Sequence, residues 1–294
     1  MGLRIKTNVN SLMAQRQLDI NSGKLGDSLE KLSSGYRINK SADDSSGLAI
    51  TETMRAKISS LAQAKRNASD AISYTQMGEG SLNDMSNILI RMKELTQQAT
   101  NDTLTENDRN NLDKEFQEIG KELFRIKNQT EFNGKFILND KSENDVKVQL
   151  GIHSTGSLDD QDDEFNQVNL KYEGVADLND SLSNLKDLNI QGETADDVAG
   201  GSVDDVFQAI DDSQEKINSM RAHFGAIQNR LSYTINSLDT ANENLNAAQS
   251  RIKDVDYASE TSQLTKSRLL VSAGTSVLAQ ANQMPEQVLA LLKQ

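Results

Sequence analysis

The residue types that usually carry chemistry are scarce in this chain of 294 residues. It contains no cysteine and only two histidines, His153 and His223, which lie far apart and outside any HExxH motif. A zinc site needs three or four ligands, so neither histidine has the partners that such a site requires. Without cysteine the chain has no thiolate nucleophile and no disulfide. The sequence therefore predicts no metal centre and no enzyme.

An acidic run at residues 159–164 (DDQDDE) is the remaining candidate for a ligand site. An EF-hand loop alternates its oxygen ligands, turns at a glycine and ends on a bidentate glutamate. The run has none of these features, and we interpret it as a solvated loop. With no cofactor predicted, the function has to be sought in the elements that dominate the chain.

The dominant element is a heptad repeat between Ser202 and Ile252. Large apolar residues recur at every seventh position, namely Ile210, Ile217, Phe224, Leu231, Leu238, Leu245 and Ile252. This spacing places them on one stripe of a helix that, at about 1.5 Å per residue, would be roughly 75 Å long. Burying each of them contributes about 1.5 to 3 kcal/mol, whereas ordering each residue of the helix costs about 1 kcal/mol. The helix must therefore pack against others as a supercoiled rod.

Other segments with helical spacing supply its partners. One occupies residues 1–32 and a second runs from about Ser45 to Ala99, where Gly78 and Gly80 are expected to loosen or bend it without ending it. A third follows Thr105, because Asp108 three positions later completes a capping box. Its apolar stripe consists of Leu112, Phe116, Ile119, Leu123 and Ile126.

After the third helix the apolar period changes to 2, which indicates short strands. Asn133-Gly134 is a hairpin-turn signal, and apolar residues then alternate with polar ones at Val146, Val148 and Leu150 and at Val168, Leu170 and Tyr172. We expect a β-hairpin region at about 131–175. The Asn-, Asp- and Gly-rich residues at about 176–201 are expected to form a connector.

Both ends of the chain carry amphipathic stripes. The first helix has Leu18, Leu25, Leu29 and Leu32, and a last helix after Ile252 has Leu264, Val271, Leu278, Val288 and Leu292. Gly23 and Gly26 lower the stability of the first helix by up to about 1 kcal/mol each, and Pro285 is expected to bend or restart the last one. Two marginal helices of this kind are expected to pack on each other.

The charge distribution limits the partners. The net charge is −13, and residues 141–212 alone carry 4 lysines against 18 acidic residues, whereas the two ends are nearly neutral. The acidic middle belongs in water, and the ends tolerate close packing among copies. No basic stripe suits nucleic acid. No apolar run has the length of a membrane span or a secretory signal peptide.

Three stretches resemble bacterial flagellins: residues 32–50 (LSSGYRINKSADDSSGLAI), residues 128–134 (NQTEFNG) and nearly all of residues 250–293. The resemblance covers roughly 1–140 and 200–294. Many flagellins insert large outer domains between these regions, and the short middle of this chain leaves no room for them. The chain thus resembles a short-form flagellin.

The resemblance implies a mainly α fold of long antiparallel coiled-coil rods with a small β-hairpin region. Residues 1–44 and 252–294 would pair as an inner coiled-coil domain, and residues 45–251 would form the rod domain. The implied function is that of an extracellular structural subunit that polymerises with its own copies into the flagellar filament. Its implied partners are an export chaperone, the type III export apparatus, and the filament cap and hook-junction proteins.

The resemblance also implies a role for particular residues. The terminal stripes would make the contacts between subunits. The core of the rod domain would consist of Leu112, Phe116, Ile119, Leu123, Ile210, Ile217, Phe224, Leu231, Leu238 and Leu245. The family also implies recognition by a Toll-like innate immune receptor. The residues that match its contacts are Arg91, Leu95 and Glu122.

Two other classes of protein stay open at this point. A secreted coiled-coil adhesin or translocator would share the apolar stripes and the charge layout without needing the terminal motifs. A hook–filament junction protein would share part of the termini.

Overall fold

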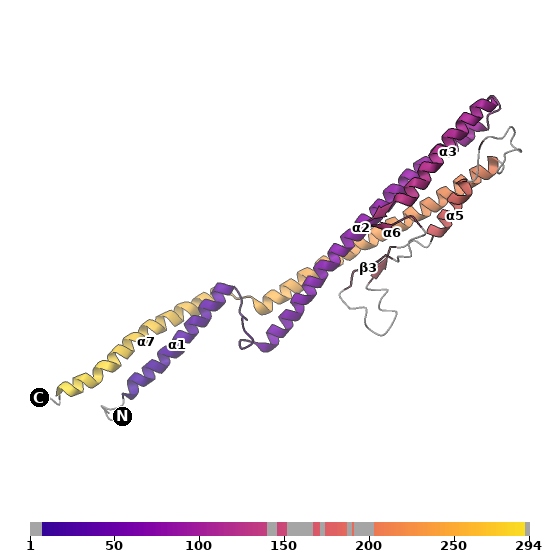
Figure 1. Ribbon diagram of the computed structural model, residues 1–294. Coiled ribbons are helices and arrows are strands. Elements are labelled where there is room, and N and C mark those ends of the chain that lie inside the picture. Colours follow the sequence, from indigo (N-terminus) through magenta and orange to yellow (C-terminus); the bar gives the residue numbers. More distant parts are fainter. Residues whose placement is uncertain are drawn as a thin grey trace. The chain divides into compact units, whose positions relative to one another are not determined.

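The computed structural model describes residues 8–139, 146–151, 167–170, 174–186, 190 and 203–291. For residues 186 and 284–291 it describes the backbone only. These residues form six helices and two small antiparallel sheets (Figure 1). The chain divides into two units. Met1–Ile58 and Glu243–Gln294 make up the terminal unit, and Ser59–Asn242 makes up the rod unit. The predicted mainly α fold is confirmed.

The rod unit is built on two long helices, α2 (Ser45–Ala99) and α6 (Val203–Lys253), which contribute to both units. They run antiparallel, because Ser86 of α2 accepts a hydrogen bond from Gln214 while Lys65, earlier in α2, pairs with Asp239, later in α6. Helix α3 (Glu106–Gln129) returns along α2 and starts at the predicted capping box of Thr105 and Asp108.

One apolar core joins these helices. The heptad stripe of α6 is buried in it from Ile210 to Leu231, whereas Leu238 and Leu245 are only half-buried. In α3, Phe116 and Leu123 are buried, and Leu112 and Ile119 pack against the core from its edge. Helix α2 contributes mainly Leu82, Met85, Leu89, Met92 and Leu95. The stripe that the sequence identifies is thus the core of the rod unit.

Helix α2 continues without interruption through Gly78 and Gly80. Gly78 is buried, and a Cβ placed on it would lie 2.7 Å from Cε2 of Phe224 in α6. The glycine therefore allows the two helices to approach closely.

Two hairpins lie between α3 and α6. Strands β1 (Glu131–Phe132) and β2 (Lys135–Phe136) pair across the predicted turn, in which Asn133 and Gly134 have φ of 51° and 77°. Positive φ at both positions is typical of a type I′ turn. Strands β3 (Lys147–Gln149) and β4 (Gln167–Asn169) pair Val148 with Val168. Tyr172 and the acidic run at 159–164 lie outside the described residues.

The expected connector is wrong over its first part, where the structure has helix α5 (Val175–Lys186). Its apolar residues Val175, Leu178, Leu182 and Leu185 recur at helical spacing and are all buried in the rod core. The polar composition of the surrounding residues hides this short stripe in the sequence. Helix α5 packs against α3.

In the terminal unit, helices α1 (Val9–Ser34) and α7 (Tyr257–Leu291) lie side by side and antiparallel, as expected (Figure 1). Asn8 caps the start of α1, and Gly35, with φ of 78°, ends it in the left-handed conformation that glycine favours. The expected restart at Pro285 is wrong, because α7 is one helix through this residue. Proline removes only one bond of the helical ladder, and Pro285 lies near the end of the helix.

Candidate assembly surface

The seam between α1 and α7 is poor in large buried side chains. Six of the predicted terminal residues line it, all half-buried: Leu18, Leu25, Leu32, Leu264, Val271 and Leu278. The buried positions of the two helices are small or polar, namely Asn21, Ser28, Ser267 and Ala281. The seam thus resembles a coiled coil in which polar residues occupy core positions.

Two hydrogen bonds join the helices at the end of the pair where α1 begins. The side-chain amide of Asn8 donates to the carbonyl of Ala281 at 2.8 Å, and the hydroxyl of Ser11 donates to Oδ1 of Asn282 at 2.7 Å. In the middle of the seam Leu18 packs on Gly274, where a Cβ would lie 3.9 Å from that of Leu18. The three contacts identify the register in which the two helices lie.

Helices α1 and α7 expose several large apolar side chains among polar ones. Met13 of α1 is 62% exposed and Leu269 of α7 is 66% exposed. We use the name outer apolar face for the large exposed apolar residues of the two helices: Val9, Leu12, Met13, Ile20, Leu29, Leu269, Leu270 and Val277. Val9, Met13 and Ile20 are spaced by four and seven residues, which places them on one stripe of α1.

The distribution of apolar side chains is inverted between the two units. Among the described residues, every buried hydrophobic side chain except Ile38 and Ala281 belongs to the rod unit. Most of the large exposed ones belong to the terminal unit. In a monomeric protein a large exposed apolar surface marks an interaction site, so the terminal unit is the candidate site.

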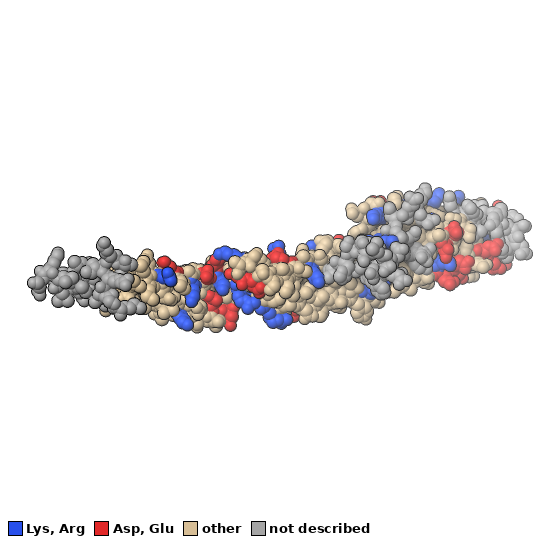
Figure 2. All heavy atoms as spheres, turned by 90° about the horizontal axis from the view of Figure 1, so that it is seen from below, with Lys and Arg blue, Asp and Glu red and all other residues tan. Residues whose placement is uncertain are grey.

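Charged side chains are unevenly distributed over the described surface. In the view of Figure 2, lysine, arginine and acidic side chains are interspersed with wide uncharged areas, and acidic side chains gather at the end of the rod unit where α6 begins. Between α1 and α7, the described side chains form no ion pair, so apolar and hydrogen-bonded contacts hold the pair together.

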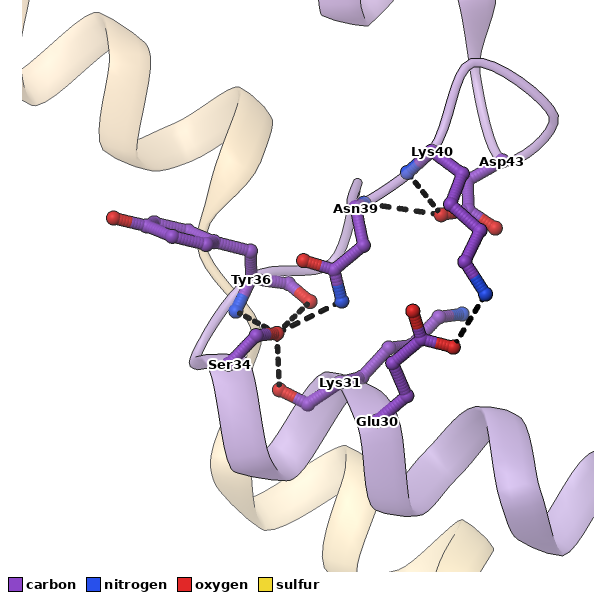
Figure 3. A network of polar contacts seen from close by, with 7 residues as sticks. All are labelled: Glu30, Lys31, Ser34, Tyr36, Asn39, Lys40 and Asp43. Atoms are coloured by element: carbon purple, nitrogen blue, oxygen red, sulfur yellow. Dashed lines mark hydrogen bonds and ion pairs between the residues drawn. The ribbon is translucent and has the colours of Figure 1, made fainter.

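The loop after α1 is tied to the helix by a polar network (Figure 3). The hydroxyl of Ser34 accepts from the amide of Tyr36 and from the side chain of Asn39, and Asp43 accepts from the backbone N–H groups of Asn39 and Lys40, both at 3.0 Å. Lys40 pairs with Glu30 at 2.7 Å. The two backbone bonds, that from Lys40 first, hold the pKa of Asp43 below its ordinary value.

The next aspartate caps helix α2. Asp44 accepts from the backbone N–H of Gly47 at 2.9 Å and from the hydroxyl of Ser46 at 2.8 Å. These bonds lower the pKa of Asp44 and satisfy donors that the first turn of a helix leaves without partners. The loop is therefore a defined structure between two helices.

The remaining predicted residues lie in different environments. Leu29 belongs to the outer apolar face, the side chain of Val288 is outside the described part, and so is Leu292. Of the receptor candidates, Arg91 is exposed and pairs with Glu115 at 2.7 Å and with Glu94 at 3.0 Å. Glu122 is half-buried, with 46% of its side chain exposed, and pairs with Arg125.

Leu95 differs from the other two receptor candidates, because it is completely buried in the rod core. A partner could not touch it while α2 packs as described. Its heptad position, ten and three residues after Met85 and Met92, already marks it as a core residue.

Sequence reasoning also missed most of the outer apolar face. The terminal stripes that it identified are the seam, and the second stripe on the same helices went unnoticed. The signal that could have found it is the spacing of Val9, Met13 and Ile20 on a helix that already has an apolar side.

The described residues offer no other chemistry. Among them no three His, Asp or Glu side chains come together as a metal site would require. Burial lowers the pKa of His223, which stays neutral at pH 7. None of the described helices combines the length and apolar character needed to cross a bilayer.

Long antiparallel helices with an exposed apolar face at one unit define a helical subunit of an assembly. Family comparisons identify which: residues 5–143 match the bacterial flagellin N-terminal helical region, and residues 207–292 match the bacterial flagellin C-terminal helical region. The chain belongs to the bacterial flagellin family of structural filament subunits.

Individual relatives match over almost their whole length. A flagellin of Halalkalibacterium halodurans is 39% identical over 98% of this chain and 99% of its own. A flagellin of Bacillus subtilis is 36% identical over 99% and 100%, and the flagellar filament 33 kDa core protein of Treponema phagedenis is 37% identical over 98% and 99%. These matches favour a filament subunit over a junction protein or an adhesin.

Proposed function

We propose that the chain polymerises with its own copies into the flagellar filament through the outer apolar face of the terminal unit. The observation that carries the proposal is the inverted apolar distribution, in which the rod unit buries its apolar side chains and the terminal unit exposes them. Each such side chain contributes on the order of 1 kcal/mol when a neighbouring copy covers it. Added over many subunits, this drives assembly.

The position of the exposed residues supports an open polymer. The stripe of α1, with Val9, Met13 and Ile20, and the pair Leu270 and Val277 of α7 belong to different helices of the unit. We propose that the α1 stripe of one copy contacts the α7 residues of the next; such a contact between two different patches is heterologous, and its repetition builds an open helical array unless the rotation closes a ring. The half-buried seam leucines would hold the pair together, and the outer face would hold the copies together.

The same distribution of apolar side chains affects how well ordered the terminal helices are in the isolated subunit. Few apolar contacts are buried within the α1–α7 pair, and segments of this kind open at low free energy. The terminal helices are expected to be disordered in the dilute monomer and to become ordered on polymerisation. Hydrogen exchange that is as slow in the terminal helices as in the rod core, measured on the dilute monomer, would contradict this.

Substitutions on the outer face test the proposal. Leu269→Asp and Val277→Asp are expected to abolish polymer in a seeded sedimentation assay, because a charge would be buried against a neighbour, while far-UV circular dichroism of the rod helices stays unchanged. The controls Leu269→Met and Val277→Ile keep the apolar surface and are expected to polymerise. Filaments of normal yield from both aspartate variants, seen by electron microscopy, would refute the role of this face.

Family membership supports the remaining partners. The chain would be kept unfolded by an export chaperone, pass through the type III export apparatus, and be added beneath the filament cap on a base of hook-junction proteins, outside the cell. The lack of cysteine suits such a route, because no disulfide can form in transit.

Recognition by a Toll-like receptor is proposed through Arg91 and Glu122 only, since the side chain of Arg91 is exposed and that of Glu122 is partly exposed. An Arg91→Ala, Glu122→Ala variant is expected to activate a receptor reporter less strongly than the unmodified chain. Leu95→Ala does not test this contact, because it opens a cavity in the core.

A further inference from the structure

The breaks between helices meet at one point of the terminal unit. The loop after α1 crosses the three-residue break between α6 and α7, where Tyr36 and Asp254 form an antiparallel bridge. The amide of Arg37 donates to the carbonyl of Lys253 at 2.7 Å, and the amide of Val255 donates to the carbonyl of Gly35 at 3.0 Å. We call residues 35–37 and 252–255 the loop clasp.

The loop clasp also completes helix α6. The last carbonyls of a helix have no partner within it. Here the backbone and guanidinium of Arg37 donate to two of them, the guanidinium reaching the carbonyl of Ile252 at 2.7 Å. A cation at this end is favoured by the helix dipole. The residue that ends α6 is therefore bound to the loop that follows α1.

Lys253 is the side chain that joins the two sides of the clasp. It is only 17% exposed, its Nζ lies 4.8 Å from the ring centroid of Tyr36, and it is 3.6 Å from a carboxylate oxygen of Glu52 in α2. A cation over an aromatic face is attracted by the ring, most strongly when it is shielded from water. In Figure 3 the Tyr36 ring points away from the Ser34 network, which leaves it free for this contact.

The seam alone does not specify how α1 and α7 are aligned. Its stripes repeat every seven residues, so a slip by one heptad, about 10.5 Å along the helix, again places leucines opposite small residues. The residues buried at its centre, Asn21, Ser28 and Ser267, are small or polar and form no large knob that would oppose a slip. The repeating stripe therefore leaves the alignment to contacts outside it.

We infer that the loop clasp sets the register of α1 against α7, with Lys253 as the positioning residue. Helix α1 ends at Ser34 and α7 begins at Tyr257, so both start from the crossing within a few residues. Once their ends are held together there, only one alignment places Leu18 on Gly274 and Ser11 beside Asn282. The register in turn decides which parts of the outer apolar face lie next to each other.

Disulfide trapping measures the register directly, because the chain has no cysteine of its own. The pair Leu18→Cys, Gly274→Cys places two Cβ atoms 3.9 Å apart, within the range of a disulfide. The pair Leu18→Cys, Ala281→Cys reports an alignment displaced by one heptad. The measured quantity is the ratio of the two intramolecular disulfide yields under identical oxidation.

The ratio is expected to fall about tenfold when the clasp is broken by Lys253→Met or Tyr36→Leu. Lys253→Met keeps the aliphatic stem and removes the charge. Tyr36→Phe and Lys253→Arg keep a ring and a cation, and are expected to leave the ratio unchanged. A general loss of helix stability would lower both yields together without moving their ratio.

Both the soluble chain and the sedimented polymer are assayed. The inference would be overturned if the ratio of disulfide yields were the same with Lys253→Met or Tyr36→Leu as without these substitutions. It would also be overturned if the chain with an intact clasp formed the native disulfide no more readily than the displaced one. Failure to polymerise is seen separately as material left in the supernatant. That failure refutes the proposed function, whereas the ratio measured in the soluble chain still tests the clasp by itself.

Discussion

Replacing Gly78 by alanine adds one methyl group where α2 lies against Phe224 of α6. The new Cβ would lie 2.7 Å from Cε2 of Phe224 and 3.1 Å from Cγ2 of Ile137. Real Cβ atoms essentially never come as close as the first of these distances, and Phe224 is almost fully buried. The ring cannot swing into solvent, so either the helices separate or the ring is strained.

Gly80 in the same helix is the matched control, because a Cβ there meets no atom within 4 Å. Alanine gains about 1 kcal/mol over glycine in an exposed helix interior, so Gly80→Ala is expected to stabilise the rod unit by up to that amount. Gly78→Ala receives the same gain and loses about 1 to 3 kcal/mol to overpacking. Since the gain is common to both, the difference between the two variants isolates the clash.

Urea unfolding followed by circular dichroism at 222 nm gives both free energies of unfolding. We expect Gly78→Ala to lie about 1 to 3 kcal/mol below Gly80→Ala, with unchanged m-values. Equal stabilities, or a more stable Gly78→Ala, would refute the close approach of α2 to α6 at this point.

Two further predictions concern the ends of helices. The pKa values of Asp43 and Asp44 are lowered by hydrogen bonds, so the loop keeps their stabilisation above about pH 4 and loses it as the pH falls through the lowered values, because the unfolded carboxylates bind protons first. Carboxyl carbon NMR titration checks this, and Ser46→Ala should raise the midpoint of Asp44 alone. At the start of α3, Thr105→Ala is expected to cost about 1 kcal/mol, whereas Thr105→Ser keeps the cap; equal urea midpoints would contradict the capping role.

The heptad period indicates the apolar side of α6 but not how far along the helix that side is buried. Ile210 and Leu245 occupy equivalent positions in the sequence, yet Ile210 is buried and Leu245 is half-buried. The difference lies in the neighbours: α3 and α5 cover the rod core, and neither is part of the terminal unit. A heptad repeat indicates which side of a helix is apolar. How much of that side is buried depends on which other helices pack against it.

The terminal unit was harder to predict for a related reason. Leu18, Leu25 and Leu32 have the spacing of a seam, and the structure places them there. The loop clasp depends on residues 35–37 and 252–255, which are far apart in the sequence and carry no periodic pattern. Hydrogen bonds between two irregular segments follow from backbone geometry, which composition and spacing do not encode.

The polar seam and the apolar outer face have opposite effects on the free subunit and on the polymer. Large apolar residues at Asn21, Ser28 and Ser267 would stabilise the α1–α7 pair in the monomer and would leave the contacts between copies unchanged. Small polar residues there leave the pair with few buried apolar contacts, so under the proposed assembly most of the apolar burial of the terminal unit would come from neighbouring copies. A marginal seam, however, gives little resistance to slipping, and a slipped pair would offer its neighbours a misaligned face. If the subunit is ordered by assembly as proposed, its register has to be set outside the apolar stripe, and the loop clasp is the contact that we propose for this role.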